Sequence, residues 1–188
     1  MVAHQPSVVN YLKLGHSVLD LCGGTGAWSR PYREAGYCVE VVDLPSDVRL
    51  LEWTGARVHG ILAAPPCTVQ SYARNRYPPT DDELLASLSV VDACLRVIFA
   101  QKPRWWALEN PRNKLRRYLG PATLEFYQWE YGDPGHKPTC IWGEFNPPPK
   151  QPKPRRKPST FRTKMENASP EDAITPAGFA RAFFESNP

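Results

Sequence analysis

An alternation of short apolar runs with helix signals between residues 17 and 111 constrains the fold of this chain more than any other feature. The runs with the length and composition of buried strands are Ser17–Cys22, Cys38–Asp43, Val58–Ala63 and Trp105–Leu108. The clearest helix is Thr80–Gln101, which begins with a capping box of Thr80 and Glu83 and ends before Pro103. Strands that alternate with helices form parallel sheets. We therefore predict an α/β fold built on a doubly wound, mostly parallel sheet.

The spacing of apolar residues predicts which side of the long helix faces the core. Its apolar face consists of Leu84, Leu85, Leu88, Val91, Leu95 and Ile98, with Cys94 on the same side. Beyond residue 111, Phe126–Tyr131 and Thr139–Trp142 are predicted to be strands joined by a turn at 132–135. A short helix is predicted within Ile174–Pro188, with Thr175 as its N-cap and Pro176 in its first turn.

Composition narrows the class of protein. The 188 residues suit one domain, and the net charge of +4 is unevenly distributed: Pro147 to Lys164 holds seven Lys or Arg residues and no acid. Such a segment suits a polyanion such as nucleic acid, or else is a flexible basic linker without a partner. The five scattered cysteines form no CxxC pair, so neither a disulfide framework nor a metal site is expected. No apolar run reaches the roughly 18 residues of a membrane span, and we expect a soluble, cytoplasmic protein.

A glycine-rich turn follows the first predicted strand. Gly24 and Gly26 would allow a ligand to approach the backbone, and Asp43 follows Gly24 by 19 residues at the end of the second strand. This is close to the spacing of about 20 residues at which an acid binds a ribose. Ser29 replaces a third glycine, so an adenosyl ligand without phosphates fits better than a pyrophosphate. Asp47 either contacts the adenine end of such a ligand or caps the segment after it.

Two polar groups are predicted at one edge of the sheet. Pro65 and Pro66 end the third strand because neither can donate to a sheet ladder, and Cys67 follows directly. Glu109 and Asn110 follow the next strand. A thiol at the carboxyl end of a parallel strand is a candidate nucleophile, although a buried cysteine can also be a small hydrophobic residue.

The segments DLCGGTGAWS, VVDLP, APPCTVQS, ALENPR and ITPAGFARAFFE resemble, in this order, the motifs of DNA (cytosine-5) methyltransferases. The likeness is closest to compact phage-type members that lack a full target-recognition domain, and it covers most of residues 17–145 and the final helix. It implies a Rossmann-like methyltransferase fold, S-adenosylmethionine as cofactor and a cytosine in double-stranded DNA as target. The catalytic residues that it implies are Cys67 as nucleophile, Glu109 as the acid that protonates ring nitrogen 3, and Asn110 as the residue that orients them.

The resemblance also implies binding residues. Contacts with the cofactor would come from Asp20, Cys22, Gly24, Gly26, Trp28, Asp43, Asp47, Val48, Pro65 and Thr175. Contacts with DNA, whose target base would be flipped out of the duplex, would come from Ser71, Arg74, Arg76, Arg112, His136, Lys137, Arg155 and Arg156. The expected organisation is a catalytic domain at 1–146, a basic proline-rich linker or reduced DNA-recognition segment at 147–164, and a helix at 165–188 that packs back on the catalytic domain. Neither a membrane nor an obligate protein partner is expected.

Some positions depart from the family pattern. Cys22 stands where an aromatic residue is usual, and Gln70 replaces a Phe or similar residue after the nucleophile. The Gln-Arg-Arg motif is missing, and Gln128, His136 and Lys137 are the nearest substitutes. Because few residues remain for reading bases, we expect a short or relaxed recognition sequence.

Three other functions remain as alternatives. The chain could methylate cytosine in RNA, or it could be a catalytically silent relative that binds nucleic acid. Methylation of an exocyclic amino group is disfavoured, because Ala64 and Cys67 stand where that chemistry needs a polar residue and an aromatic one.

Overall fold

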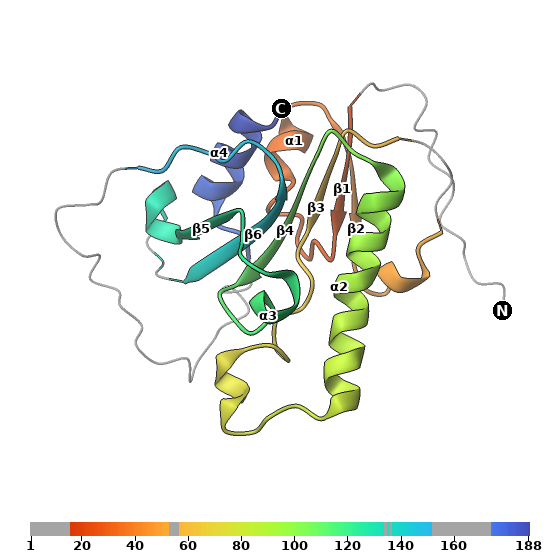
Figure 1. The fold of residues 1–188 in the computed structure, drawn as a ribbon. Helices are drawn as coiled ribbons and strands as arrows, with labels where there is room; N and C mark the ends of the chain where they lie inside the picture. Colours follow the sequence, from red (N-terminus) through yellow and green to blue (C-terminus); the bar gives the residue numbers. More distant parts are fainter. Residues whose placement is uncertain (1–15, 53–56, 134, 136, 152–173) are drawn as a thin grey trace.

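The computed structural model describes residues 16–52, 57–133, 135, 137–151 and 174–188. A six-stranded sheet in the order β2-β1-β3-β4-β6-β5 is the centre of the molecule (Figure 1). Its strands are β1 (Ser17–Leu21), β2 (Cys38–Val42), β3 (Gly60–Ala63), β4 (Trp105–Pro111), β5 (Leu124–Tyr127) and β6 (Pro138–Glu144). The first four pair in parallel, whereas β6 runs antiparallel to both β4 and β5. The predicted α/β class with a mostly parallel sheet is confirmed.

Helices cover both faces of this sheet. On one face lies α2 (Asp81–Gln101), and on the other lie α1 (Arg30–Glu34) and α4 (Ala177–Ser186), as Figure 1 shows. A further short helix, α3 (Arg116–Leu119), follows β4. Three 3-10 turns complete the described elements: η2 (Val48–Leu50), η3 (Tyr72–Asn75) and η4 (Gln128–Tyr131).

Successive side chains of β1 point to opposite faces of the sheet, and each face has its own hydrophobic core. Leu19 and Leu21 point into the cluster under α2, which also contains Val91, Cys94 and Ile98 of that helix. Val18, one position out of phase, belongs to the cluster on the other face. There it joins Trp28, Tyr32, Trp105, Phe126, Phe179 and Phe183 in a largely aromatic core.

The long helix begins as predicted. The Thr80 side chain accepts from the backbone N–H of Glu83, and the Glu83 carboxylate accepts from the N–H of Thr80. The prediction that Leu85 faces the core is wrong, because its side chain is 65% exposed. The buried positions of α2 begin only at Val91, and the first turns extend past the edge of the sheet (Figure 1), where no core lies beneath them.

Two later elements differ from the sequence-based predictions. The strand expected over Phe126–Tyr131 ends at Tyr127, where Glu130 turns back to accept from the Tyr127 N–H and the chain continues as η4. Thr175 does not cap the last helix, which begins at Ala177 after Pro176. Instead the carboxylate of Asp133, from the turn after η4, accepts from the N–H of Gly178 at 3.1 Å. A side chain distant in sequence therefore caps α4.

Some expectations lie partly outside the described residues. The described residues end at 151 and resume at 174, so they do not include most of the predicted linker at 147–164. The boundaries of the three predicted segments therefore stay predictions. Within the described ranges, no helix combines the length and apolarity needed to cross a bilayer. In the same ranges, no three His, Cys, Asp or Glu side chains gather in a way that could hold a metal ion.

We expect the substitution Phe183→Ala to lower the free energy of unfolding by about 3–5 kcal/mol, as for other buried aromatic residues. Its ring is fully buried and lies 5.5 Å from Trp28 and 5.7 Å from Trp105, centroid to centroid. Urea unfolding would measure the loss. The control is Phe99→Ala, on a ring that is 62% exposed, with an expected change below about 0.5 kcal/mol. Equal losses in the two variants would contradict the packing of α4.

Candidate active site

The strand order reverses between β1 and β3, at the carboxyl ends of both strands. From β1 the chain moves outward to β2, and then returns to the other side of β1 as β3. The backbone ladder continues beyond the strands, since the N–H of Cys22 donates to Val42 at 2.7 Å and that of Ala64 donates to Leu21 at 2.9 Å. Ligands of open α/β sheets bind at such a switch point, where the two diverging loops leave a crevice.

The glycine-rich turn after β1 forms one side of this switch point. Gly24 and Gly26 have φ of +53° and +67°, which favour glycine. A Cβ built on Gly24 would lie 3.7 Å from a carboxylate oxygen of Asp43, so this backbone and this acid border the same space. The other Asp43 oxygen accepts from the N–H of Leu44, and the first accepts no hydrogen bond from the residues that the structure describes. An acceptor beside open backbone fits a ligand with hydroxyl groups, such as a ribose.

Asp20 lies beneath that turn. Its carboxylate is fully buried and accepts a hydrogen bond of 2.5 Å from the Ser29 hydroxyl, while its second oxygen has no partner among the described residues. A Cβ on Gly23 would come within 2.4 Å of this carboxyl group, so the turn closes directly over it. Burial raises the pKa of Asp20 to about 6. Asp20 therefore holds the shape of the turn from below.

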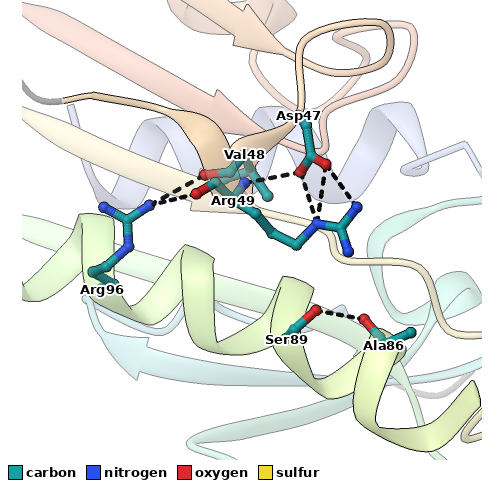
Figure 2. Close-up of polar contacts among 6 residues, drawn as sticks. All are labelled: Asp47, Val48, Arg49, Ala86, Ser89 and Arg96. Carbon is teal, nitrogen blue, oxygen red and sulfur yellow. Dashed lines mark hydrogen bonds and ion pairs between the residues drawn. The ribbon is translucent and has the colours of Figure 1, made fainter. Parts of the chain in front are cut away.

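The segment after β2 contains Asp47 and Val48, both expected to contact a cofactor. Figure 2 shows that the Asp47 carboxylate accepts from the backbone N–H of Arg49 and from its guanidinium, with a shortest distance of 2.6 Å. The capping role of Asp47, one of the two that the sequence left open, is the one observed. Val48 is buried in the core, and Arg96 of α2 donates to the carbonyl oxygens of Val48 and Arg49 (Figure 2).

Two other expected cofactor residues have partners in the core. Cys22 has a φ of +55° and lies against the buried thiol of Cys94, whose hydrogen bond lowers the pKa of Cys22. Trp28 is 2% exposed and packs on Phe179 and Phe183, so its indole ring does not face the switch point as a free surface.

The candidate nucleophile lies just after β3, and the candidate acid lies within the neighbouring parallel strand β4, which continues to Pro111, beyond the end predicted at Leu108. Cys67 comes four residues after the end of β3 and is partly buried, and Glu109 lies in the last part of β4. Burial raises the pKa of both groups. Lys137 lies just before β6, and its positive charge lowers the pKa of both Cys67 and Glu109. The charge of Glu109 in turn raises the pKa of Cys67, so the three side chains share one electrostatic environment.

A small pocket adjoins this group. Its walls include Glu109, Lys137 and the last of the expected cofactor residues, Thr175, together with Gln128, Thr139 and the ring of Phe126. Cys67 is not one of the residues that line it. The pocket therefore brings the carboxyl and ammonium groups together, with the thiol within reach of their charges but outside the walls.

A buried chain of amides connects these strand ends. The Asn110 side chain donates to the carbonyl of Pro65 at 2.8 Å, and Asn113 donates to the Asn110 side-chain oxygen at 2.5 Å. Asn113 also accepts from the backbone N–H of Leu115, a turn that asparagine commonly forms. All three amide contacts lie below the surface, so they fix the segment that carries Cys67 against the end of β4.

The expected DNA contacts that the structure describes lie in three places: around η3, after β4, and at Lys137 just before β6. Ser71, Arg74 and Arg76 follow Cys67 around η3, and Arg74 pairs with Glu83 at 2.8 Å. Arg112 is exposed after β4, where Glu125 lies 3.8 Å away. His136, Arg155 and Arg156 lie outside the described residues.

Sequence reasoning missed several residues around the site. Asn113 was not singled out, although an asparagine three residues after Asn110 is a signal for a side-chain turn. Thr139 lines the pocket from β6, and no local motif marks it. Gln70 was noted only as a departure, yet it is 1% exposed and its amide exchanges hydrogen bonds with Ser87 of α2.

Comparisons with known proteins give little beyond this geometry. No family model matches the chain, and no curated protein matches it. Among solved structures, the chain is similar to one described as a candidate DNA modification methyltransferase encoded within a prophage (E. coli). The two are 18% identical with a TM-score of 0.49; the match covers 69% of this chain and 46% of the other, so the chain spans about half of that structure.

The raised pKa of Asp20 predicts a pH-dependent stability. Because the folded state binds this proton more tightly than the unfolded state, folding gains stability below the unfolded value of 3.8 and loses it as the pH rises through about 6. The loss between about pH 4 and pH 7 should be about 2 kcal/mol relative to Asp20→Asn, which cannot ionise. Urea unfolding of both proteins across this range would measure it. If the stability of the two proteins changed with pH in the same way, the raised pKa of the buried Asp20 carboxyl group would be contradicted.

Proposed function

We propose that this protein is a DNA (cytosine-5) methyltransferase that uses S-adenosylmethionine. The observation that carries the proposal is the shared environment of Cys67, Glu109 and Lys137 at strand ends that adjoin the switch point. A thiol beside a carboxyl group and a cation is the set that nucleophilic activation of a cytosine ring requires. The motifs of the sequence that resemble this family include both the thiol and the carboxyl group.

Cys67 would act as the nucleophile. Carbon 5 of cytosine is a poor nucleophile until a group adds at carbon 6, and the thiolate of Cys67 would form that carbon–sulfur bond. Burial raises the pKa of the thiol and so favours its neutral form, whereas Lys137 favours the thiolate. Once carbon 5 carries the methyl group, its proton would pass to water, the electron pair would expel the thiolate, and the proton on ring nitrogen 3 would return to Glu109.

Glu109 would act as the acid. Addition of sulfur at carbon 6 moves electrons toward ring nitrogen 3, and a protonated carboxyl group can donate a proton there. The raised pKa of Glu109 supports this role, because at any given pH it keeps more of the carboxyl group protonated than an exposed glutamate would be. Asn110 would position both groups, since its amide joins the end of β4 to the carbonyl of Pro65.

The switch point would hold the cofactor. The open backbone at Gly24 and Gly26 and the free oxygen of Asp43 fit the ribose of an adenosyl group, and Asp20 would keep the turn in place. Bound there, S-adenosylmethionine supplies an electrophilic methyl group. Cys22, Trp28, Asp47, Val48, Pro65 and Thr175 complete the proposed cofactor-binding set, several of them by shaping the site through the core.

Lys137 is our candidate for the cation that the missing Gln-Arg-Arg motif would supply. It lies in the pocket with Glu109, where an ammonium group could bind the carbonyl oxygen of a flipped cytosine. DNA phosphates would be bound by Ser71, Arg74, Arg76 and Arg112, and beyond the described residues by His136, Arg155 and Arg156. Affinity that comes mainly from phosphates predicts a short or relaxed recognition sequence.

A covalent trap tests the chemistry directly. DNA that contains 5-fluorocytosine, incubated with the protein and S-adenosylmethionine, should become covalently attached because fluorine blocks the loss from carbon 5. Cys67→Ser should abolish the band on a denaturing gel, while Cys38→Ser, at a partly buried thiol in β2, should retain it. A band that persists in Cys67→Ser, or none in the unaltered protein, would contradict the proposal. A covalent band that forms with RNA containing 5-fluorocytosine but not with the DNA would identify RNA as the substrate.

The environment of Lys137 predicts a pH profile. The active form carries the thiolate and the protonated acid, so the single-turnover rate should rise up to the pKa of Glu109 and fall above that of Cys67. Lys137→Met should move both arms to higher pH, because the cation lowers both pKa values. At a fixed pH below the plateau, the rate should fall by about tenfold for each pH unit by which the pKa of Cys67 rises. Lys102→Met, an exposed lysine at the end of α2, is the control. An identical pH profile in Lys137→Met and the unaltered protein would contradict the role of Lys137.

A further inference from the structure

We propose that exposed tyrosines beside Cys67 are stacking platforms for an unpaired strand, and that the preferred substrate is single-stranded DNA. The tyrosine–arginine surface consists of two segments: Tyr72, Arg76 and Tyr77 around η3, and Lys114, Arg117 and Tyr118 around α3. The choice of DNA rests on the function proposed above, whereas the stacking role is argued from the surface itself.

The rings of this surface are unusually open to solvent. Tyr72, Tyr77 and Tyr118 are 47%, 68% and 50% exposed. A single exposed aromatic residue is common on any protein, but several in two adjoining segments are a feature of surfaces that bind something. None of the three phenolic hydroxyl groups has a hydrogen bond among the described residues, so no side-chain hydrogen bond within the fold explains why these rings lie at the surface.

The two segments adjoin each other through the backbone. The carbonyl of Gln70, just before η3, accepts from the N–H of Lys114, just before α3, at 3.0 Å. Figure 1 shows both turns at the same end of the molecule, with η3 in yellow and α3 in green. Cys67 precedes Gln70 by three residues, so the surface begins at the proposed nucleophile.

The η3 segment is held in place rather than free to move as a loop. Gln70 is buried and its amide exchanges two hydrogen bonds with Ser87 of α2, at 2.8 and 3.1 Å. Further along, Arg74 pairs with Glu83 of the same helix at 2.8 Å. Rings carried by an anchored segment lose little freedom on binding, which favours their use as rigid contacts.

The charge of the surface suits a phosphate backbone. Residues 112–118 carry four cations and no acid. The nearby Glu83 and Glu125 already pair with Arg74 and Arg116, and within the described part of the chain Arg76, Lys114 and Arg117 have no ion pair. Asp81 and Asp82 lie at the start of α2, so the positive charge concentrates on Arg76 and on the α3 side. The Arg76 guanidinium lies 5.5 Å from the centre of the Tyr77 ring and orients it.

Aromatic rings between cations are the arrangement that binds single strands. In a duplex the faces of the bases are already stacked on one another, so protruding tyrosine rings gain nothing from them. Unpaired bases offer a free face each, and such stacking tolerates any sequence. An unpaired target cytosine also removes the cost of extruding it from a duplex. This differs from the double-stranded target that the family resemblance implies.

Fluorescence anisotropy of the full chain with one labelled oligonucleotide, single-stranded and as duplex, tests the proposal at fixed salt. We expect the single strand to bind more tightly than the duplex. Tyr77→Ala should weaken single-strand binding by about five- to a hundredfold, while Tyr77→Phe, which keeps the ring, stays within about twofold. Duplex binding should change much less, and Phe99→Ala, an exposed ring on α2, should change neither.

Several results would overturn the proposal: a duplex that binds as tightly as the single strand, an unchanged affinity in Tyr77→Ala, or an equal loss in Tyr77→Phe. Tighter binding of the matching RNA would overturn the choice of DNA. The binding measurement involves no methyl transfer. A failed fluorocytosine trap therefore does not decide the outcome of this binding test. In the same way, a failed binding test does not decide the outcome of the trap.

Discussion

Parallel pairing of β3 with β1 on one side and β4 on the other is the constraint on which the rest of the structure depends. Leu21, Ala63 and Leu108 lie side by side in this register, so the chain leaves all three strands at the same edge. The glycine-rich turn, the segment of Cys67 and the carboxyl group of Glu109 each begin within a few residues of these positions. A slip of one residue in β3 would exchange its two faces and separate Cys67 from the other groups.

Burial at this edge acts in opposite directions on the groups that the proposed reaction uses. It raises the pKa of Glu109, which favours the protonated acid, and also that of Cys67, which disfavours the thiolate. Lys137 opposes both effects. The site therefore depends on a balance among three charges, and the buried amides of Asn110 and Asn113 hold the segment before Cys67 against the end of β4, where Glu109 lies.

Much of the fold was predictable because its signals are local. The capping box at Thr80 and the prolines after Ala63 act within a few residues, and the start of α2 and the end of β3 that they predict agree with the structure. The cap of α4 was not predictable in this way, because Asp133 reaches Gly178 across 45 residues. The same reason applies to the site: Cys67 and Glu109 stand in recognisable motifs, whereas the closeness of Lys137 to both arises only when β6 pairs with β4.

The shared environment of Cys67 and Glu109 is the central claim, and the titration of the Cys67 thiol tests it most directly. Alkylation by iodoacetamide, followed across pH by mass spectrometry for each cysteine, reports the thiolate fraction at Cys67. Glu109→Gln removes a negative charge that raises the pKa of this thiol, so Cys67 should react at lower pH in that variant while Cys38 is unchanged. An identical Cys67 titration in the two proteins would contradict the account.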